Sequence, residues 1–143
     1  MRTLLSACFA LSCASAAAAG CPPADPFAAL SAINTSPAPY SVWYGATTIT
    51  GPADAKGRIP MAITGEDVVH GVPVQAAFVC KGAGCAAAKA SDKALVFAEI
   101  TGTNPVIPVL AIDACPTFYV ADIDAGLLGE VRSEIRGIMG QDE

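Results

Sequence analysis

Beyond residue 20, Gly, Pro or a charged residue interrupts every apolar stretch of this 143-residue chain. No stretch there approaches the roughly 20 apolar residues that cross a bilayer. Short stretches that are rich in β-branched and aromatic residues and bounded by turn residues are typical of β-strands. Pro73 and Pro108 fall inside two such stretches, which predicts sheet edges, bulges or strand starts at those points. We expect five strands, at residues 41–50, 58–64, 72–80, 94–100 and 106–112.

A short helix is predicted before these strands. Asp25 followed by Pro26 is typical of a helix start, because the carboxylate accepts a backbone hydrogen bond and Pro suits the first turn. Apolar residues then recur at helical spacing until residues 34–37 end the pattern: Phe27, Leu30 and Ile33.

A second helix is predicted after the strands, with Asp122 or Asp124 as its cap. One apolar stripe runs along it, formed by Leu127, Leu128, Val131, Ile135 and Ile138. Such a stripe is typical of a helix that packs on a sheet. The alternative, a membrane-surface or partner helix, would carry an excess of Lys and Arg on its polar face.

This order of elements favours a mainly β fold with flanking helices. Parallel βαβ units need a helix between successive strands, and the predicted strands have turn signals between them instead. We therefore expect a small five-stranded, OB-like antiparallel barrel with a C-terminal amphipathic helix. With 53% hydrophobic residues, the chain is too apolar for a disordered tail and has the length of one domain.

Residues 1–20 are typical of a secretory signal peptide: a basic start, an apolar run, then small residues. We expect a periplasmic or secreted protein whose mature part, residues 21–143, is a single disulfide-stapled domain. The alternative is a lipoprotein with a lipid anchor on Cys21. Ala18-Ala19-Gly20-Cys21 has the small residues accepted before an acylated cysteine, although a Leu is usual where Ala18 stands.

The charge of the chain excludes two classes of partner. Eight Lys and Arg stand against 13 Asp and Glu, for a formal net charge of −5, and the basic residues form no cluster. Nucleic acids and anionic lipid surfaces both require grouped Lys and Arg. We therefore expect neither as a partner.

Four cysteines follow the targeting segment, and they predict two disulfides. An even number of cysteines in an exported domain is typical of structural bonds. Zinc sites and thiol oxidoreductases favour Cys-x-x-Cys, whereas four residues separate Cys80 from Cys85. We expect no metal, and the pairs Cys80–Cys85 and Cys21–Cys115. The first closes a Gly-containing loop, and the second fastens the N-terminal helix to the last strand.

Residues that could carry out catalysis are few. His70 is the only histidine, and no Gly-x-Ser-x-Gly motif is present to supply a nucleophile beside it. Gly82-Ala83-Gly84 lacks the Lys-Ser/Thr end of a phosphate loop. We therefore expect no catalytic residue and no cofactor.

Five residues remain as candidates for binding: Trp43, Tyr44, Glu66, Asp67 and His70. Trp43 and Tyr44 lie on opposite faces of one predicted strand, so at least one belongs to the core and the other is a candidate anchor. The simplest interpretation of Glu66 and Asp67 is a turn before Val68.

The order of elements and cysteines resembles that of netrin-like and tissue-inhibitor-of-metalloproteinase-like OB-fold domains of exported bacterial proteins. The shared features are Cys21 at the mature start, a short helix, a strand ending in Gly45, the run Lys93-Ala94-Leu95-Val96-Phe97-Ala98 after a cysteine, a strand ending in Cys115, and the C-terminal helix. In that family the N-terminal cysteine bonds to cysteines around the Leu-Val-Phe-Ala strand. This permits the alternative pairs Cys21–Cys85 and Cys80–Cys115. The inhibitors begin Cys-x-Cys, which chelates the protease zinc, whereas this chain has Cys21 alone, so the resemblance implies the fold rather than inhibition.

We expect a non-enzymatic exported domain that binds a protein or envelope component through loops at one rim of the barrel. These loops are residues 51–57, 65–71 and 80–92. The alternative is a small hydrolase that cleaves an envelope glycan with carboxylates alone. Glu66, Asp67, Glu99 or Asp113 gathered in one cleft would favour the enzyme.

Overall fold

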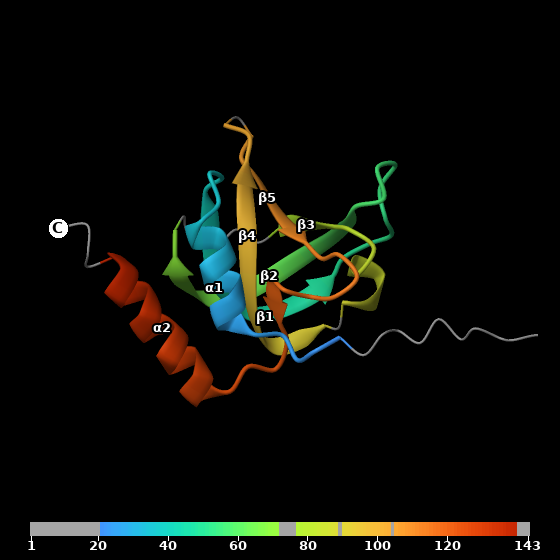
Figure 1. Cartoon of the computed structure of the whole chain (residues 1–143). Helices are drawn as coiled ribbons and strands as arrows, with labels where there is room; N and C mark the ends of the chain where they lie inside the picture. The colour runs from blue at the N-terminus through green and yellow to red at the C-terminus, as the bar shows by residue number, and fades with distance from the viewer. Residues whose placement is uncertain (1–20, 72–76, 89, 104, 140–143) are drawn as a thin grey trace, which may run out of the picture.

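The computed structural model describes residues 21–71, 77–88, 90–103 and 105–139 (Figure 1). The elements in chain order are α1 (Pro26–Asn34), β1 (Tyr40–Ile49), β2 (Ile59–His70), β3 (Ala77–Lys81), the 3-10 turn η1 (Cys85–Ala87), β4 (Ser91–Thr101), β5 (Ile107–Ala111), β6 (Tyr119–Val120) and α2 (Ala125–Met139). The predicted signal peptide at residues 1–20 and residues 72–76 of the third predicted strand lie outside the described residues.

Helix α1 begins and ends where its sequence predicts. Asp25 accepts a hydrogen bond from the backbone N–H of Phe27 at 2.9 Å, and Pro26 occupies the first turn. Beyond the helix, the Thr35 hydroxyl donates to the carbonyls of Ser31 and Ala32, at 3.3 and 3.1 Å. These contacts satisfy backbone groups that a short helix leaves without partners at its ends.

Five strands close into a barrel in the order β1-β2-β3-β5-β4, with β4 pairing back to β1. The neighbouring strands are antiparallel except β3 and β5, which run parallel, with Val79 opposite Val109. The predicted OB-like barrel is therefore confirmed, with one parallel pair where an antiparallel barrel was expected. The reason is topological: the β4–β5 hairpin lies between β1 and β3, so β5 meets β3 without a direct connection.

Strand β4 separates two apolar cores, and its sequence shows why. Residues 94–98 are all buried, and they alternate between the two sides of the sheet. Ala94, Val96 and Ala98 face the barrel interior, whereas Leu95 and Phe97 belong to an outer core beneath the helices. A strand covered on both faces is apolar throughout, which explains the uninterrupted run in this segment.

Both helices pack on the outer core, on the same side of the barrel (Figure 1). The predicted stripe of α2 does face inward: Leu128, Val131 and Ile135 are buried, and Leu127 and Ile138 are half-buried. Neither helix in the described part of the chain is long and apolar enough to cross a membrane.

The cap of α2 is Asp124, which accepts from the backbone N–H of Leu127 at 2.9 Å. Asp122 has a different role. Its backbone adopts a positive φ of 54°, and its carboxylate accepts from the Ser91 hydroxyl at 2.8 Å. Asp122 therefore fixes the turn after β6 against the start of β4.

The prediction for residues 65–71 is wrong. That stretch was expected to be a rim loop with Glu66 and Asp67 in a turn, but β2 continues through it to His70. Pairing with β1 extends the strand, since Asp67 lies opposite Tyr44 and Gly65 opposite Gly45. The β1–β2 register shifts twice along this extension, opposite Val42/Trp43 and opposite Tyr44/Gly45, and each shift leaves one extra residue on β2.

The remaining strands differ from their predictions mainly in length. Strand β4 begins at Ser91, three residues before the predicted start. Pro108 is the second residue of β5 and precedes its pairing with β3, as expected for a strand start. The two-residue strand β6, which pairs with Leu95 and Val96, was not predicted.

Candidate functional site

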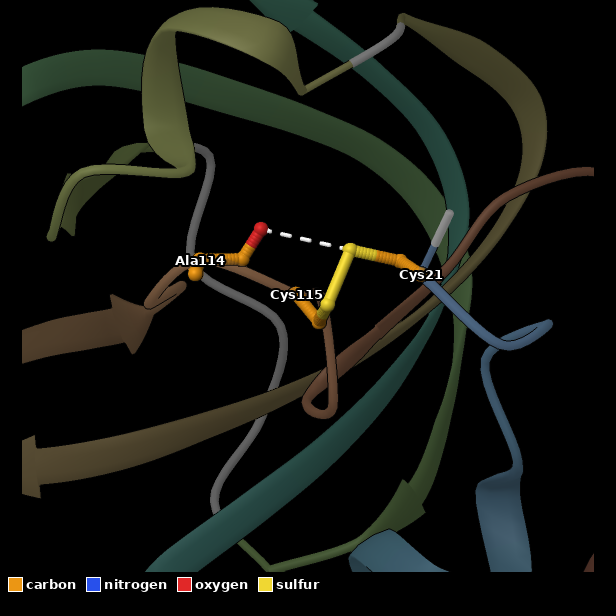
Figure 2. The surroundings of a disulfide bond; sticks show 3 residues. All are labelled: Cys21, Ala114 and Cys115. Carbon is orange, nitrogen blue, oxygen red and sulfur yellow. Dashed lines mark hydrogen bonds between the residues drawn. A yellow bond between two sulfur atoms is a disulfide. The ribbon is translucent and has the colours of Figure 1, made fainter. Parts of the chain in front are cut away.

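The four cysteines form the pairs Cys21–Cys115 and Cys80–Cys85, with Cα–Cα distances of 5.4 and 5.9 Å. Figure 2 shows the first bond, which joins the segment before α1 to the segment after β5. The sulfur of Cys21 also lies 3.4 Å from the carbonyl oxygen of Ala114. A disulfide sulfur bears no hydrogen, so this is a close contact and not a donated hydrogen bond. The alternative pairing permitted by the family resemblance does not occur.

The glycines of the Cys80–Cys85 loop allow the loop to pack closely against residues 112 and 113. A Cβ on Gly82 would lie 2.0 Å from the carbonyl oxygen of Ile112, and one on Gly84 would lie 2.0 Å from that of Asp113. The N–H of Gly84 donates to the Ile112 carbonyl at 3.0 Å. Only residues without a side chain allow the loop to approach the end of β5 this closely.

A cavity of about 340 Å³ lies between the two helices and the outer face of β1; we call it the interhelix cavity. Tyr40 and Val42, two residues apart on β1, share one face of the strand, and His70 is the partner of Val42 on β2. Helix α1 and the last turns of α2 supply the walls. The other lining residues are Leu30, Ile33, Asn34, Ala38, Pro39, Ile135 and Ile138.

Tyr40 lies at the border between the interhelix cavity and β4. Its hydroxyl donates to a carboxylate oxygen of Glu99 at 3.4 Å, and its ring is 5.8 Å from that of Phe118. Burial raises the pKa of Tyr40, and the negative charge of Glu99 raises it further. Tyr40 is therefore a neutral hydroxyl at physiological pH, with Glu99 as its acceptor.

A second cavity, of about 520 Å³, lies beside the Cys21–Cys115 bond. Cys21, Pro23 and Ala24 line one part of it, and Pro116, Tyr119 and Val120 line another. Its lining is mostly apolar, and among the described residues that line it Tyr119 is the one with a titratable side chain. The hydroxyl of Tyr119 is already hydrogen-bonded to that of Thr47 at 2.7 Å.

Among the described side chains, the candidate binding residues do not form one site, although Tyr44 and Asp67 lie opposite each other on β1 and β2. Trp43 is fully buried in the barrel interior, with its ring 6.3 Å from that of Phe78, so it is a core residue. Tyr44 is half-buried against the outer core. Asp67 forms an ion pair with Arg132 of α2, and His70 lines the interhelix cavity. The side chain of Glu66 lies outside the described part of the structure.

The carboxylates named for a hydrolase do not share a cleft among the described side chains. Asp67 is paired with Arg132, and Glu99 accepts from Tyr40. Asp113 is exposed after β5. None of the three lines either cavity. Among the described residues, no group of three or more His, Cys, Asp and Glu side chains is placed to hold a metal ion.

Most residues of the interhelix cavity were not singled out from the sequence. The helical spacing of Leu30, Ile33 and Ile135 indicated only that they face the core. Their meeting around His70 depends on how α1 and α2 dock side by side, which no local pattern encodes. Comparisons with protein-family models, curated proteins and solved structures found no match to this chain.

Proposed function

We propose that this protein is an exported binding domain that takes an apolar group of a protein or other envelope component into its interhelix cavity. The cavity itself carries this proposal. Its volume is at the lower end of the roughly 300–1,000 Å³ typical of ligand sites. Its lining residues resemble those of such sites, because seven of the ten are apolar and the other three, Asn34, Tyr40 and His70, supply polar groups.

The scaffold supports a role in binding. The outer core packs α1 and α2 on the barrel, and the Cys21–Cys115 bond fastens the segment before α1, so the cavity is formed before any ligand arrives. A preformed site loses less conformational entropy on binding than one that must order first. The disulfides also support a periplasmic or secreted location, where such bonds persist.

We further propose that the domain is related to the netrin-like and tissue-inhibitor-of-metalloproteinase-like OB-fold domains. The closed barrel and the bond from Cys21 to a cysteine after the Leu95-Val96-Phe97-Ala98 strand support this relationship. The inhibitors of that family begin Cys-x-Cys, whereas this chain has Cys21 without a second cysteine beside it, and Cys21 is bonded to Cys115. We therefore propose binding without protease inhibition.

The test compares two substitutions of equal size. Ala38→Leu places a larger side chain into the cavity, whereas Ala28→Leu places it on the exposed face of α1. The wild type and both variants, as residues 21–143 with their disulfides formed, are immobilised and incubated with the envelope fraction of the producing cell. We expect Ala38→Leu to lower the captured amount of the wild-type partner about tenfold, because it fills the site. Ala28→Leu should capture as much as the wild type.

Thermal unfolding of both variants controls for folding. If Ala38→Leu retains full capture with an unchanged Tm, the interhelix cavity is not the binding site. If the wild type instead cleaves an envelope glycan, the protein is a hydrolase and the binding-domain proposal is wrong.

A further inference from the structure

Cys21 is the residue on which two modes of maturation compete. Ala18-Ala19-Gly20-Cys21 contains the small residues accepted before an acylated cysteine. In a lipoprotein, the sulfur of that cysteine carries a diacylglyceryl group through a thioether. In the structure, the same sulfur is bonded to Cys115 (Figure 2). A thioether sulfur has no free valence for a second sulfur, so one molecule can have only one of these bonds.

The surroundings of Cys21 belong to the folded domain. Only four residues separate it from the start of α1 at Pro26. Within that short connection, Ala24 packs against the outer core, and Pro23 and Ala24 line the second cavity together with Pro116. The Cys21–Cys115 bond and the half-buried Ala24 therefore hold this segment close to the barrel, although Cys21 and Pro23 are exposed. The segment does not form the extended tether that would carry a domain away from a membrane surface.

Acylation would also leave a defect in this fold. Cys115 is half-buried beside the barrel and would become an unpaired thiol. The chain between the two cysteines, 94 residues apart, would lose the covalent bond that joins its ends. That bond would then no longer hold the segment before α1 against the end of the barrel.

We infer that Cys21 matures by oxidation and not by acylation, so that the exported protein is released rather than anchored. The signal peptide is cleaved before Gly20 or Cys21, and the thiols of Cys21 and Cys115 form one S–S bond. Their two electrons and two protons pass to a disulfide oxidant of the exported compartment, whose own disulfide is reduced to two thiols. The inference is independent of the proposed binding site.

The test expresses the full chain with its own residues 1–20 in a bacterium that acylates lipoproteins. Exported protein is treated with a thiol-alkylating reagent without reduction, and its intact mass is measured in the soluble and membrane fractions. We expect the wild type in the soluble fraction, starting at Gly20 or Cys21, with two disulfides, no alkylated thiol and no acyl mass. Acylated wild-type protein in the membrane fraction would overturn the inference.

Two variants complete the experiment. Cys115→Ser removes the competing thiol and leaves residues 1–21 unchanged. It should remain soluble, with Cys21 now alkylated by the reagent, because the inferred cleavage before Gly20 or Cys21 does not depend on the disulfide. Acylation of this variant would contradict that cleavage.

Ala18→Leu completes the motif and serves as the matched positive control. We expect it to be acylated, membrane-bound and alkylated at Cys115. A native lipoprotein of the host reports that acylation is active in every sample.

Discussion

Arg132 on α2 and Asp67 on β2 form an ion pair that joins the last helix to the strand carrying His70. The two residues are 65 positions apart in the sequence. Ile135, one turn after Arg132, lines the interhelix cavity, as does His70, three residues after Asp67. The ion pair therefore holds one wall of the cavity to its floor.

Loss of this ion pair should have a modest, salt-dependent effect. The side chains are 41% and 44% exposed, and pairs of this kind contribute about 0.2–1 kcal/mol. We expect Arg132→Gln to lower the free energy of unfolding by that amount in urea denaturation at low salt, and by less in 1 M salt because of screening. The charge-reversed double variant Asp67→Arg/Arg132→Asp should recover most of the loss. Equal stability of Arg132→Gln and the wild type at low salt would contradict the prediction.

The buried hydrogen bond between the hydroxyls of Thr47 and Tyr119, 2.7 Å long, should show strong coupling. Tyr119→Phe leaves the Thr47 hydroxyl without this partner in the barrel interior, which should lower the free energy of unfolding by about 1–3 kcal/mol. Thr47→Val/Tyr119→Phe removes both hydroxyls and should be more stable than the sum of the two single changes indicates. A double-mutant cycle by chemical denaturation measures the difference, and additive effects would show that the bond is not coupled.

The two disulfides should differ in their contribution to stability. The Cys21–Cys115 bond spans 94 residues and the Cys80–Cys85 bond spans five. The chain-entropy relationship gives about 4–5 kcal/mol for the long loop and about 2 kcal/mol for the short one. We therefore expect Cys21→Ala/Cys115→Ala to unfold at lower urea concentration than Cys80→Ala/Cys85→Ala. The reverse order would show that the burial of Cys80 and Cys85 outweighs loop closure.

The β1–β2 turn should lose stability in acid through Asp54. Its carboxylate accepts from the backbone N–H groups of Arg58 and Lys56 at 2.9 and 2.8 Å, and it pairs with the Arg58 guanidinium at 2.8 Å. The hydrogen bond from the Arg58 backbone is the largest cause that lowers the pKa of Asp54 below its ordinary value of 3.8. A lowered folded-state pKa stabilises the fold above the unfolded pKa, and this stabilisation is lost as the pH falls through the folded pKa.

Asp54→Asn should therefore be less stable than the wild type at pH 6, and the difference should shrink below about pH 4. Urea denaturation at a series of pH values measures it. A difference that stays constant from pH 6 to pH 3 would show that the carboxylate charge does not hold the turn.

Local patterns in the sequence determined the elements whose partners are near in the chain. Asp25 and Pro26 define the start of α1, and the helical spacing of Leu128, Val131 and Ile135 defines the buried face of α2. Hairpin turns are also determined locally, because the hydrogen bonds of Asp54 join residues that are only a few positions apart in the sequence. The uninterrupted apolar run of a strand buried on both faces is also a local property, and it is visible in residues 94–98.

Only the tertiary structure decided where distant segments meet. Residues 65–70 are a strand because β1 pairs with them, although Gly65 and the charged residues after it are typical of a turn. Strand β6 exists because β4 offers an edge to Tyr119 and Val120. The interhelix cavity and the Asp67–Arg132 pair arise when α1 and α2 dock on the outer core. Each depends on contacts between residues far apart in the chain, so no short window of sequence carries the signal.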